Sequence, residues 1–364
     1  MLLFWAWPEL RAYAQALAIL EQLDGKPVPR LLRSCAAMPL RGSNVAFSSA
    51  AGTVHAHLYT PATRANAPGI VLVPGIHNLG MDEPRLVSFA RSIAACGLRV
   101  MTPELPDSRD YRIQPSDLEA IGSAAQWLRQ ATGRRVGLLG ISFSGGLALM
   151  TAALPAYAND VSFVFSIGAH DDLFRVASFY TSGADPLPHG NVERATPNPY
   201  GPMILEYEHL EDFVPAADVP FIRPVLRAHL HQNDAAEKRR LMTLNETQKR
   251  EYARLIDTAN QDWAVSVSNK RHFAEMAAVS PHGHLQGLRA PVYILHGRGD
   301  NLIPFAEAEW LARDLPHGTL QEMAISPLIG HVGLVHERSG FLQKWQLLHL
   351  LAQVMERAEN PPHA

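Results

Sequence analysis

Cysteine is scarce in this sequence, since Cys35 and Cys96 are the only two among its 364 residues. A disulfide framework is therefore excluded, and a reducing compartment, the cytoplasm, is the expected location. Excess charge of either sign is also lacking, because 32 basic and 35 acidic residues leave a net charge of −3. This balance is too even for binding through nucleic-acid phosphates or anionic lipid head groups, so neither is an expected partner.

A secretory leader is not expected at the N-terminus, although the chain opens on the apolar run Met1–Trp7. The run lacks a positive n-region, and Glu9 and Arg11 interrupt it before it could span a bilayer. We interpret residues 1–25 as an amphipathic helix docked on the body, with Pro8 in its first turn. Contact of this helix with a membrane interface or a partner surface stays open as the alternative.

The remaining sequence indicates a large, compact α/β protein. Hydrophobic residues make up 47% of the chain and charged residues 18%, which is ordinary globular composition. An antiparallel hairpin is expected from 44–48 with 53–59, and strands from the apolar runs 69–73, 98–102, 135–141 and 161–167. Helical patterns separate these runs, one of them opening on a capping box at Ser116 and Glu119. The alternation predicts a doubly wound, mostly parallel sheet.

The alternation stops over residues 172–286, which carry no apolar strand run and read as an inserted helical cap. It resumes with a strand at 291–295, a helix at 305–315 and a strand at 320–325. The last helix is expected to bury one face, made of Phe341, Trp345, Leu348, Leu351 and Met355. The expected domains are thus a core of 1–171 with 287–364 and a cap of 172–286.

The strongest motif is GISFSGG at 140–146, between an apolar strand and an Ala/Leu-rich helix. A serine on a sharp strand-to-helix turn needs small residues two positions before and after it, since neighbouring backbone would otherwise collide. Gly140 and Ser144 meet that need for Ser142. The motif resembles the G-x-S-x-G nucleophile elbow of the α/β-hydrolase family, with Ser144 in place of the last glycine. Ser144 also has small flanks and is a rival nucleophile, but it would push the turn two residues into the helix.

A catalytic serine needs a base, which an acid orients in turn. The resemblance implies the chain order serine, acid, histidine. Asp300 lies in the run HGRGDNLIP after an apolar strand and matches the family's acid position, with Asp171 and Asp172 as a second candidate position. His331 follows the last expected strand, where the family keeps its catalytic base, whereas His336 is interpreted as a solvated residue.

The oxyanion hole is expected from two backbone amides. One is that of Phe143, directly after the nucleophile. The resemblance takes the other from the loop after the third strand, here Pro74 to Asn78, where Ile76 is the best match. His77 and Asn78 either line the pocket or hydrogen-bond within their own loop.

No cofactor and no metal ion are expected. The pairs His229/His231 and His282/His284 have no cysteine or acidic residue near them at ligand spacing, so they are interpreted as ordinary surface residues. Neither a dinucleotide-binding glycine motif nor a Walker loop is present.

Together, the resemblance implies an α/β hydrolase with a helical cap that cleaves carboxylic esters of small molecules through an acyl-enzyme. Cap aromatics are expected to form the roof of an apolar acyl pocket: Phe179, Tyr180, Tyr200, Tyr207 and Phe213.

Other functions remain open. An aminopeptidase would hold the substrate ammonium with a cap carboxylate from the set Glu206, Glu208, Glu211 and Asp212. An acyltransferase would differ by excluding water from the acyl-enzyme. A non-catalytic binding module is the alternative from another class, and a haloalkane dehalogenase is disfavoured because it needs Asp at position 142. The sequence does not predict the oligomeric state.

Overall fold

An eight-stranded sheet forms the centre of the computed structural model, which describes residues 2–50, 52–257, 265–266, 269–330, 333–334 and 340–360. The strand order is β1-β2-β4-β3-β5-β6-β9-β10. The strands are β1 (Leu40–Ser49), β2 (Gly52–Pro61), β3 (Gly69–Val73), β4 (Arg99–Pro103), β5 (Val136–Ile141), β6 (Val161–Ile167), β9 (Val292–Gly297) and β10 (Leu320–Ser326). Within this eight-stranded sheet, β1 with β2 and β2 with β4 pair antiparallel and the other neighbours pair parallel, which confirms the predicted doubly wound, mostly parallel sheet.

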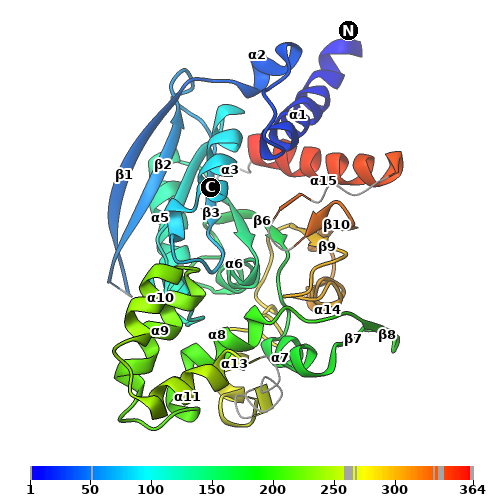
Figure 1. Cartoon of the computed structure of the whole chain (residues 1–364). Coiled ribbons are helices and arrows are strands. Elements are labelled where there is room, and N and C mark those ends of the chain that lie inside the picture. Colours follow the sequence, from blue (N-terminus) through cyan, green and yellow to red (C-terminus); the bar gives the residue numbers. More distant parts are fainter. Residues whose placement is uncertain are drawn as a thin grey trace.

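Helices cover both faces of the sheet (Figure 1). One face carries α1 (Leu2–Leu23), α3 (Pro84–Ala95) and α15 (Phe341–Glu359), and the other carries α5 (Ser116–Thr132), α6 (Phe143–Ala153) and α14 (Ala306–Asp314). Successive residues of β3 alternate between the two cores: Ile70 and Leu72 pack with the first group, Val71 and Val73 with the second. Burial on both faces explains why this strand is a continuous apolar run.

The two terminal helices pack side by side, with Arg11 of α1 and Glu359 of α15 forming an ion pair at 3.3 Å (Figure 1). The predicted place of Pro8 is wrong, because α1 begins at Leu2 and Pro8 lies inside it. Within the described part of the chain, no helix has the length and hydrophobicity needed to cross a membrane.

The predicted apolar face of the last helix is also wrong at its beginning. Phe341 is 83% exposed and Trp345 is 45% exposed. The buried stripe comprises Leu347, Leu350, Leu351, Ala352, Val354, Met355 and Ala358. The buried stripe thus begins at Leu347, and the first turns of α15 lie outside the core.

The capping box predicted at residues 116 and 119 is not formed. Helix α5 begins at Ser116 itself, with no side-chain cap, because the Ser116 hydroxyl donates instead to the Asp107 carboxylate at 2.8 Å. The Glu119 carboxylate accepts from the Tyr157 hydroxyl. Both side chains thus have tertiary partners that local spacing could not reveal.

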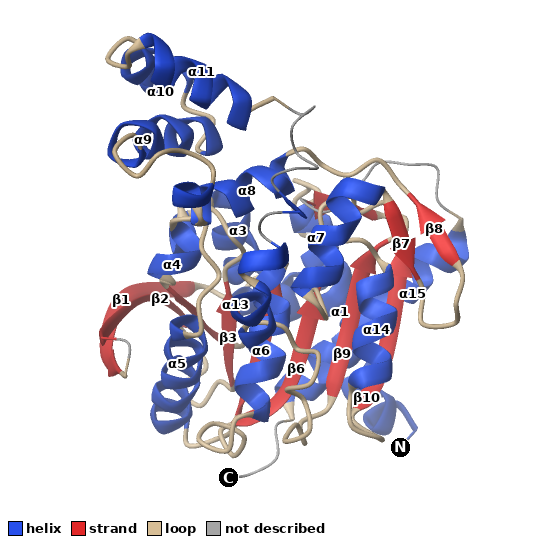
Figure 2. Cartoon of the chain, turned by 90° about the horizontal axis from the view of Figure 1, so that it is seen from below, coloured by secondary structure: helices blue, strands red, loops and turns tan. Residues whose placement is uncertain are grey.

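The described residues between 172 and 286 are mainly helical, and Figure 2 shows α9, α10 and α11 grouped to one side of the sheet. The helices are α7 (Leu173–Ser182), α8 (Tyr200–Glu208), η3 (Leu210–Asp212), α9 (Val219–Leu230), α10 (Asp234–Leu241), α11 (Glu246–Leu255) and α13 (Phe273–Ala278). Two short strands that the sequence did not predict, β7 (Ala184–Pro186) and β8 (Val192–Arg194), pair antiparallel. Residues of α8, η3, α9 and α11 form a hydrophobic cluster of their own with Tyr111 of the body. The extent of the cap as 172–286 stays a prediction.

Candidate active site

The turn from β5 to α6 holds Ser142 in a strained backbone conformation. Its φ is +59° and its ψ is −139°, and it is one of three described non-glycine residues with positive φ. A Cβ at position 140 would lie 2.3 Å from the Ser144 carbonyl oxygen and 2.6 Å from the Gly145 Cα, so only glycine fits there. A strained serine between a strand and the first turn of a helix is the geometry of a nucleophile elbow.

The rival serine has a structural partner. Ser144 is fully buried, and its Oγ donates a hydrogen bond to the Pro74 carbonyl oxygen at 2.6 Å. This bond ties the first turn of α6 to the loop after β3. The geometry therefore favours Ser142 over Ser144 as nucleophile, and the side chain of Ser144 acts as a brace between the two loops.

The loop after β3 runs beside the elbow, as an oxyanion hole requires. A Cβ at position 75 would lie 3.5 Å from the Ser142 Cβ, which shows how closely the backbone approaches there. Among the described residues, no hydrogen bond engages the amide of Ile76. The amide of Phe143, in the first turn of α6, has no partner within its helix. The roles of both amides stay predictions.

His77 and Asn78, at the end of that loop, both form hydrogen bonds. The Nδ1 of His77 accepts from the Leu79 amide at 3.2 Å, and the Asn78 carbonyl accepts from the Arg109 guanidinium at 3.0 Å. Burial lowers the pKa of His77. The neighbouring Glu83 caps α3, accepting from the Leu86 amide at 2.7 Å.

Asp300 lies buried just past the carboxyl end of β9, with its Oδ2 3.8 Å from the Nε2 of the buried His296. Its Oδ1 accepts from the amides of Leu302 and Ile303, both at 3.0 Å. Its Oδ2 is 3.7 Å from the position that a Cβ on Gly168 would take, just past the end of β6. Because β6 lies between β5 and β9, Asp300 and Ser142 follow strands at the same edge of the sheet.

The second candidate acid position is occupied by structural contacts. Asp171 Oδ2 accepts from the Arg175 guanidinium at 2.8 Å, and the amides of Asp171 and Asp172 both donate to Glu307. Burial and the nearby Glu307 carboxylate raise the pKa of Asp171 to about 7. Asp172 caps α7 through the Phe174 amide. These contacts favour Asp300 as the acid.

The predicted base, His331, lies outside the described residues, as does His336. The described residue before it, Gly330, belongs to the short strand β11 (Ile329–Gly330), which pairs with β12 (Gly333–Leu334). A Cβ on Gly297 would lie 2.3 Å from the Ile329 carbonyl and 3.5 Å from the Gly330 Cα. The residues directly before position 331 thus lie against the end of β9. Asp300 follows that end of the strand by three residues.

A cavity of about 310 Å³ opens beside the elbow, since Phe143 forms part of its wall. The wall is mostly apolar, with Ile113, Phe143, Leu173, Val176, Ala177, Tyr180, Ile204, Leu205, Met276 and Val279. Its polar side chains are Gln114, Glu208, His209 and Glu275. Of the five aromatics predicted to form the roof of an acyl pocket, Tyr180 is in the described lining of this cavity. Tyr200, Tyr207 and Phe213 pack in the cluster around Tyr111 instead.

The four cap carboxylates have separate environments. Glu208 lines the cavity, accepts from the Gln114 amide at 2.8 Å and has a pKa raised by burial to about 7. Glu206 is buried among the cap helices, away from the cavity lining. Glu211 bonds Arg223, and Asp212 bonds Arg271 and His272. Glu208 is thus the one member of this set placed to meet a ligand.

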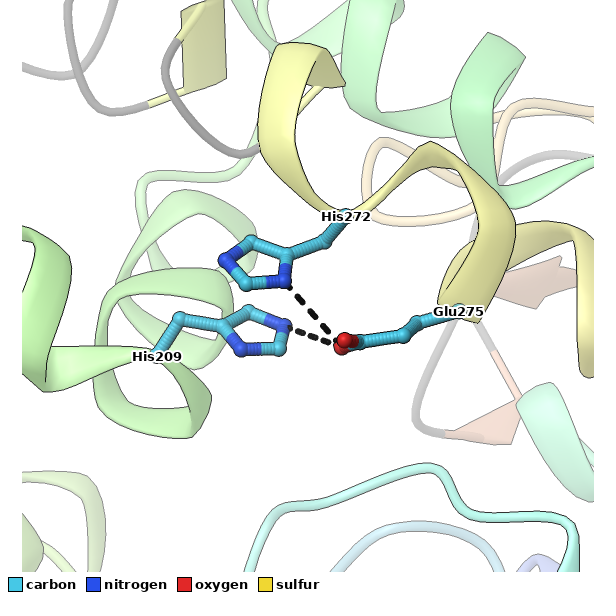
Figure 3. A group of neighbouring side chains, drawn as sticks. All are labelled: His209, His272 and Glu275. Atoms are coloured by element: carbon cyan, nitrogen blue, oxygen red, sulfur yellow. Dashed lines mark hydrogen bonds and ion pairs between the residues drawn. The ribbon is translucent and has the colours of Figure 1, made fainter.

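The predicted H-x-H pairs bond to protein groups. His229 Nδ1 contacts Glu237 at 3.2 Å, and His284 Nδ1 contacts the Ser280 carbonyl at 2.9 Å. Sequence spacing gave neither pair an acidic neighbour, but the fold places Glu237 beside His229, and Asp171 and Asp314 around His282. Sequence spacing also missed a second cluster, His209 with His272 and Glu275 (Figure 3).

Comparison with known families identifies the class. The model of the alpha/beta hydrolase family matches residues 70–340, and the chain belongs to that family. A comparison with curated proteins found no match.

Solved structures are similar over most of the chain. A protein of Legionella pneumophila, described only provisionally as a hydrolase, is 14% identical, with a TM-score of 0.60 over 95% of each chain. Puromycin hydrolase is 12% identical over 89% of this chain and 40% of its own, with a TM-score of 0.50. Brefeldin A esterase, a bacterial homologue of human hormone sensitive lipase, is 14% identical over 94% and 85%, with a TM-score of 0.48. At such identity, the match to the Legionella protein shows a shared fold, and family membership supports a role as a hydrolase.

Proposed function

We propose that this protein is a serine hydrolase that cleaves carboxylic esters through an acyl-enzyme. The observation that carries the proposal is Ser142, held at positive φ on the elbow beside a largely apolar cavity. Phe143, the residue after Ser142, lines that cavity, so an acyl chain bound there would bring its carbonyl carbon close to the elbow, and the first amides of α6 would stabilise the developing oxyanion.

In the proposed mechanism, Ser142 Oγ attacks the ester carbonyl while His331 accepts the hydroxyl proton. The amides of Ile76 and Phe143 stabilise the tetrahedral oxyanion. His331 then gives its proton to the leaving alcohol, and the acyl group stays on Ser142. A water molecule next attacks the acyl-enzyme in the same way, with His331 as base, which releases the carboxylic acid and restores Ser142. Asp300 orients the imidazole and stabilises its charged form. The steps need no redox partner.

The cavity indicates the substrate class. Its volume of about 310 Å³ is at the small end of small-molecule pockets, and its lining suits an aliphatic acyl chain. Each buried methylene contributes about 0.8 kcal/mol, so kcat/KM should rise about fourfold per added carbon until the cavity is full.

A series of p-nitrophenyl esters of increasing chain length tests this proposal. Replacement Leu205→Trp narrows the cavity and should move the optimum to shorter chains, whereas Met242→Trp, at a residue that is 75% exposed, should not. No turnover of any ester by a folded, unmodified protein would refute the proposed function. If Leu205→Trp leaves the preferred chain length unchanged, the cavity does not hold the acyl chain.

One observation favours a second candidate, an aminopeptidase. The Glu208 carboxylate is in the cavity wall and could pair with a substrate ammonium. Aminoacyl p-nitroanilides should then be cleaved, and Glu208→Gln should raise KM for them while leaving unchanged the hydrolysis of p-nitrophenyl esters that carry no amino group.

A further inference from the structure

Three successive residues of the body contact both the cap helices and the loop that is expected to carry an oxyanion donor. They are Arg109, Asp110 and Tyr111, where the short helix α4 (Pro106–Arg109) ends in a turn. The loop is 74–78, after β3, and the cap helices in contact are α8 and α9. We call these three residues the 109–111 bridge, because their side chains divide their contacts between the loop and the cap.

Arg109 holds the end of the loop. Its Nε donates to the Asn78 carbonyl oxygen at 3.0 Å. Its Nη1 lies 3.5 Å from the carboxylate of Glu104, which is buried just past the end of β4. The ion pair fixes the guanidinium on the body. Because Asn78 follows Ile76 by two residues, this contact restrains the backbone that carries the Ile76 amide.

Asp110 and Tyr111 hold the cap. Asp110 Oδ1 accepts from the Tyr207 hydroxyl and its Oδ2 from the Arg227 guanidinium, both at 2.8 Å. The Tyr111 hydroxyl donates to the Leu230 carbonyl oxygen, at the end of α9, at 3.1 Å. The bridge therefore reaches α8 through one residue and α9 through two.

The backbone of Tyr111 is strained. Its φ is +58°, which is rare for a bulky residue, and the residue is 1% exposed. Such a conformation persists only where the surrounding contacts determine it. Here the ring packs edge to face against Tyr200 and Tyr207 of α8, with centroids 6.0 and 6.4 Å away. The strained turn thus directs the ring into the cap, while Arg109, two residues earlier, contacts the loop.

Ile76 itself also contacts the cap. Its side chain packs against both the core of the body and the hydrophobic cluster around Tyr111. The same cluster contains Ile204 of α8, which lines the cavity. The wall of the cavity, the 109–111 bridge and the expected oxyanion donor therefore pack against one another.

We propose that Arg109 and Tyr111 are positioning residues, which place the Ile76 amide for the tetrahedral oxyanion by fixing its loop to the cap. This inference rests on the proposed function, in which Ile76 supplies one oxyanion donor. Such a donor stabilises the transition state much more than the bound ester. Neither Arg109 nor Tyr111 belongs to the described lining of the cavity. Loss of the bridge should therefore lower kcat and leave KM nearly unchanged.

Ester kinetics of Arg109→Met test the proposal, and this side chain is 48% exposed, so its replacement should leave the fold intact. We expect kcat to fall about tenfold while KM changes by less than about twofold. An alkylboronic acid, which forms a tetrahedral adduct with an activated serine, should bind more weakly by about the same factor as kcat falls. Titration of active sites with a fluorophosphonate corrects for any inactive fraction. Tyr111→Phe removes only the hydroxyl and should also lower kcat at nearly constant KM.

A matched control and a variant on the cap side separate this role from a general structural effect. Arg85→Met removes another exposed guanidinium, which pairs with Glu83 beyond the same loop, and should leave kcat unchanged. Arg227→Met breaks the bridge at Asp110, where it meets the cap. Adding it to Arg109→Met should lower kcat no further, because the two residues act through the same bridge.

The proposal is overturned if Arg109→Met keeps its kcat, or if it binds the boronic acid as tightly as the unmodified protein does. It is also overturned if the losses caused by Arg109→Met and Arg227→Met multiply in the double variant. An unmodified protein that cleaves no ester overturns the proposed function and this inference with it, whereas an active protein with an unimpaired Arg109→Met variant overturns this inference alone.

Discussion

The two serines of the elbow should respond oppositely to replacement by alanine. Ser144 Oγ donates to the Pro74 carbonyl at 2.6 Å in a fully buried position. Ser144→Ala leaves that carbonyl without its donor, at a cost of about 1–3 kcal/mol in the free energy of unfolding. Residues selected for chemistry commonly contribute little to stability, so Ser142→Ala should destabilise the protein less than Ser144→Ala does.

The effects of the two variants on activity should be the reverse of their effects on stability. Ser142→Ala should lower kcat on the order of 10⁴-fold or more, because no nucleophile remains. Ser144→Ala should lower kcat by about tenfold, since the loop that carries Ile76 loses its tie to α6 and the oxyanion donor is less well positioned. Urea unfolding and ester kinetics on both variants provide the two readouts. An inactive Ser144→Ala variant, or a Ser142→Ala variant that is the less stable of the two, would show that these roles of the two serines are wrong.

Three further predictions follow from single contacts. Gly140→Ala should destabilise the protein by about 3 kcal/mol or more, because its Cβ would lie 2.3 Å from the Ser144 carbonyl oxygen, whereas Gly42→Ala, with open space around it, should be neutral in thermal unfolding. Asp300→Asn should keep the fold, since its amide oxygen can still accept from the loop amides, but should lower kcat about 10⁴-fold through the wrong imidazole tautomer, and near-normal kcat would contradict the acid assignment. Burial raises the pKa of Glu206 to about 8, so the native state holds this proton more tightly than the unfolded chain and loses stability as pH rises from about 4.5 to about 8. Glu206→Gln should remove that loss, which urea unfolding of both proteins at about pH 5 and about pH 9 measures. An equal change in the free energy of unfolding between these two pH values in both proteins would contradict the prediction.

The sequence predicted those features that depend on neighbours along the chain. The parallel sheet follows from short apolar runs that alternate with helical patterns, because burial on both faces requires continuous apolar residues. The elbow follows from the steric need for a small residue at position 140, which the structure bears out at 2.3 Å. The place of Asp300 after a buried strand follows from the same strand pattern.

Long-range partners were beyond the reach of sequence spacing. The bond from Ser144 to Pro74 joins residues 70 positions apart, and nothing in the elbow motif announces it. Helical periodicity shows that the cap aromatics are buried, but not whether they face the cavity or the cluster around Tyr111. The grouping of His209 with His272 and Glu275 joins two distant segments that only the fold brings together, so spacing along the chain could not reveal it.

Labelling with a fluorophosphonate, followed by peptide mass mapping, shows whether Ser142 is an activated nucleophile. We expect one adduct per chain, on Ser142, that is lost in both Ser142→Ala and His331→Ala while Ser144→Ala still reacts. An adduct on Ser144, or a folded protein that does not react at all, would contradict it.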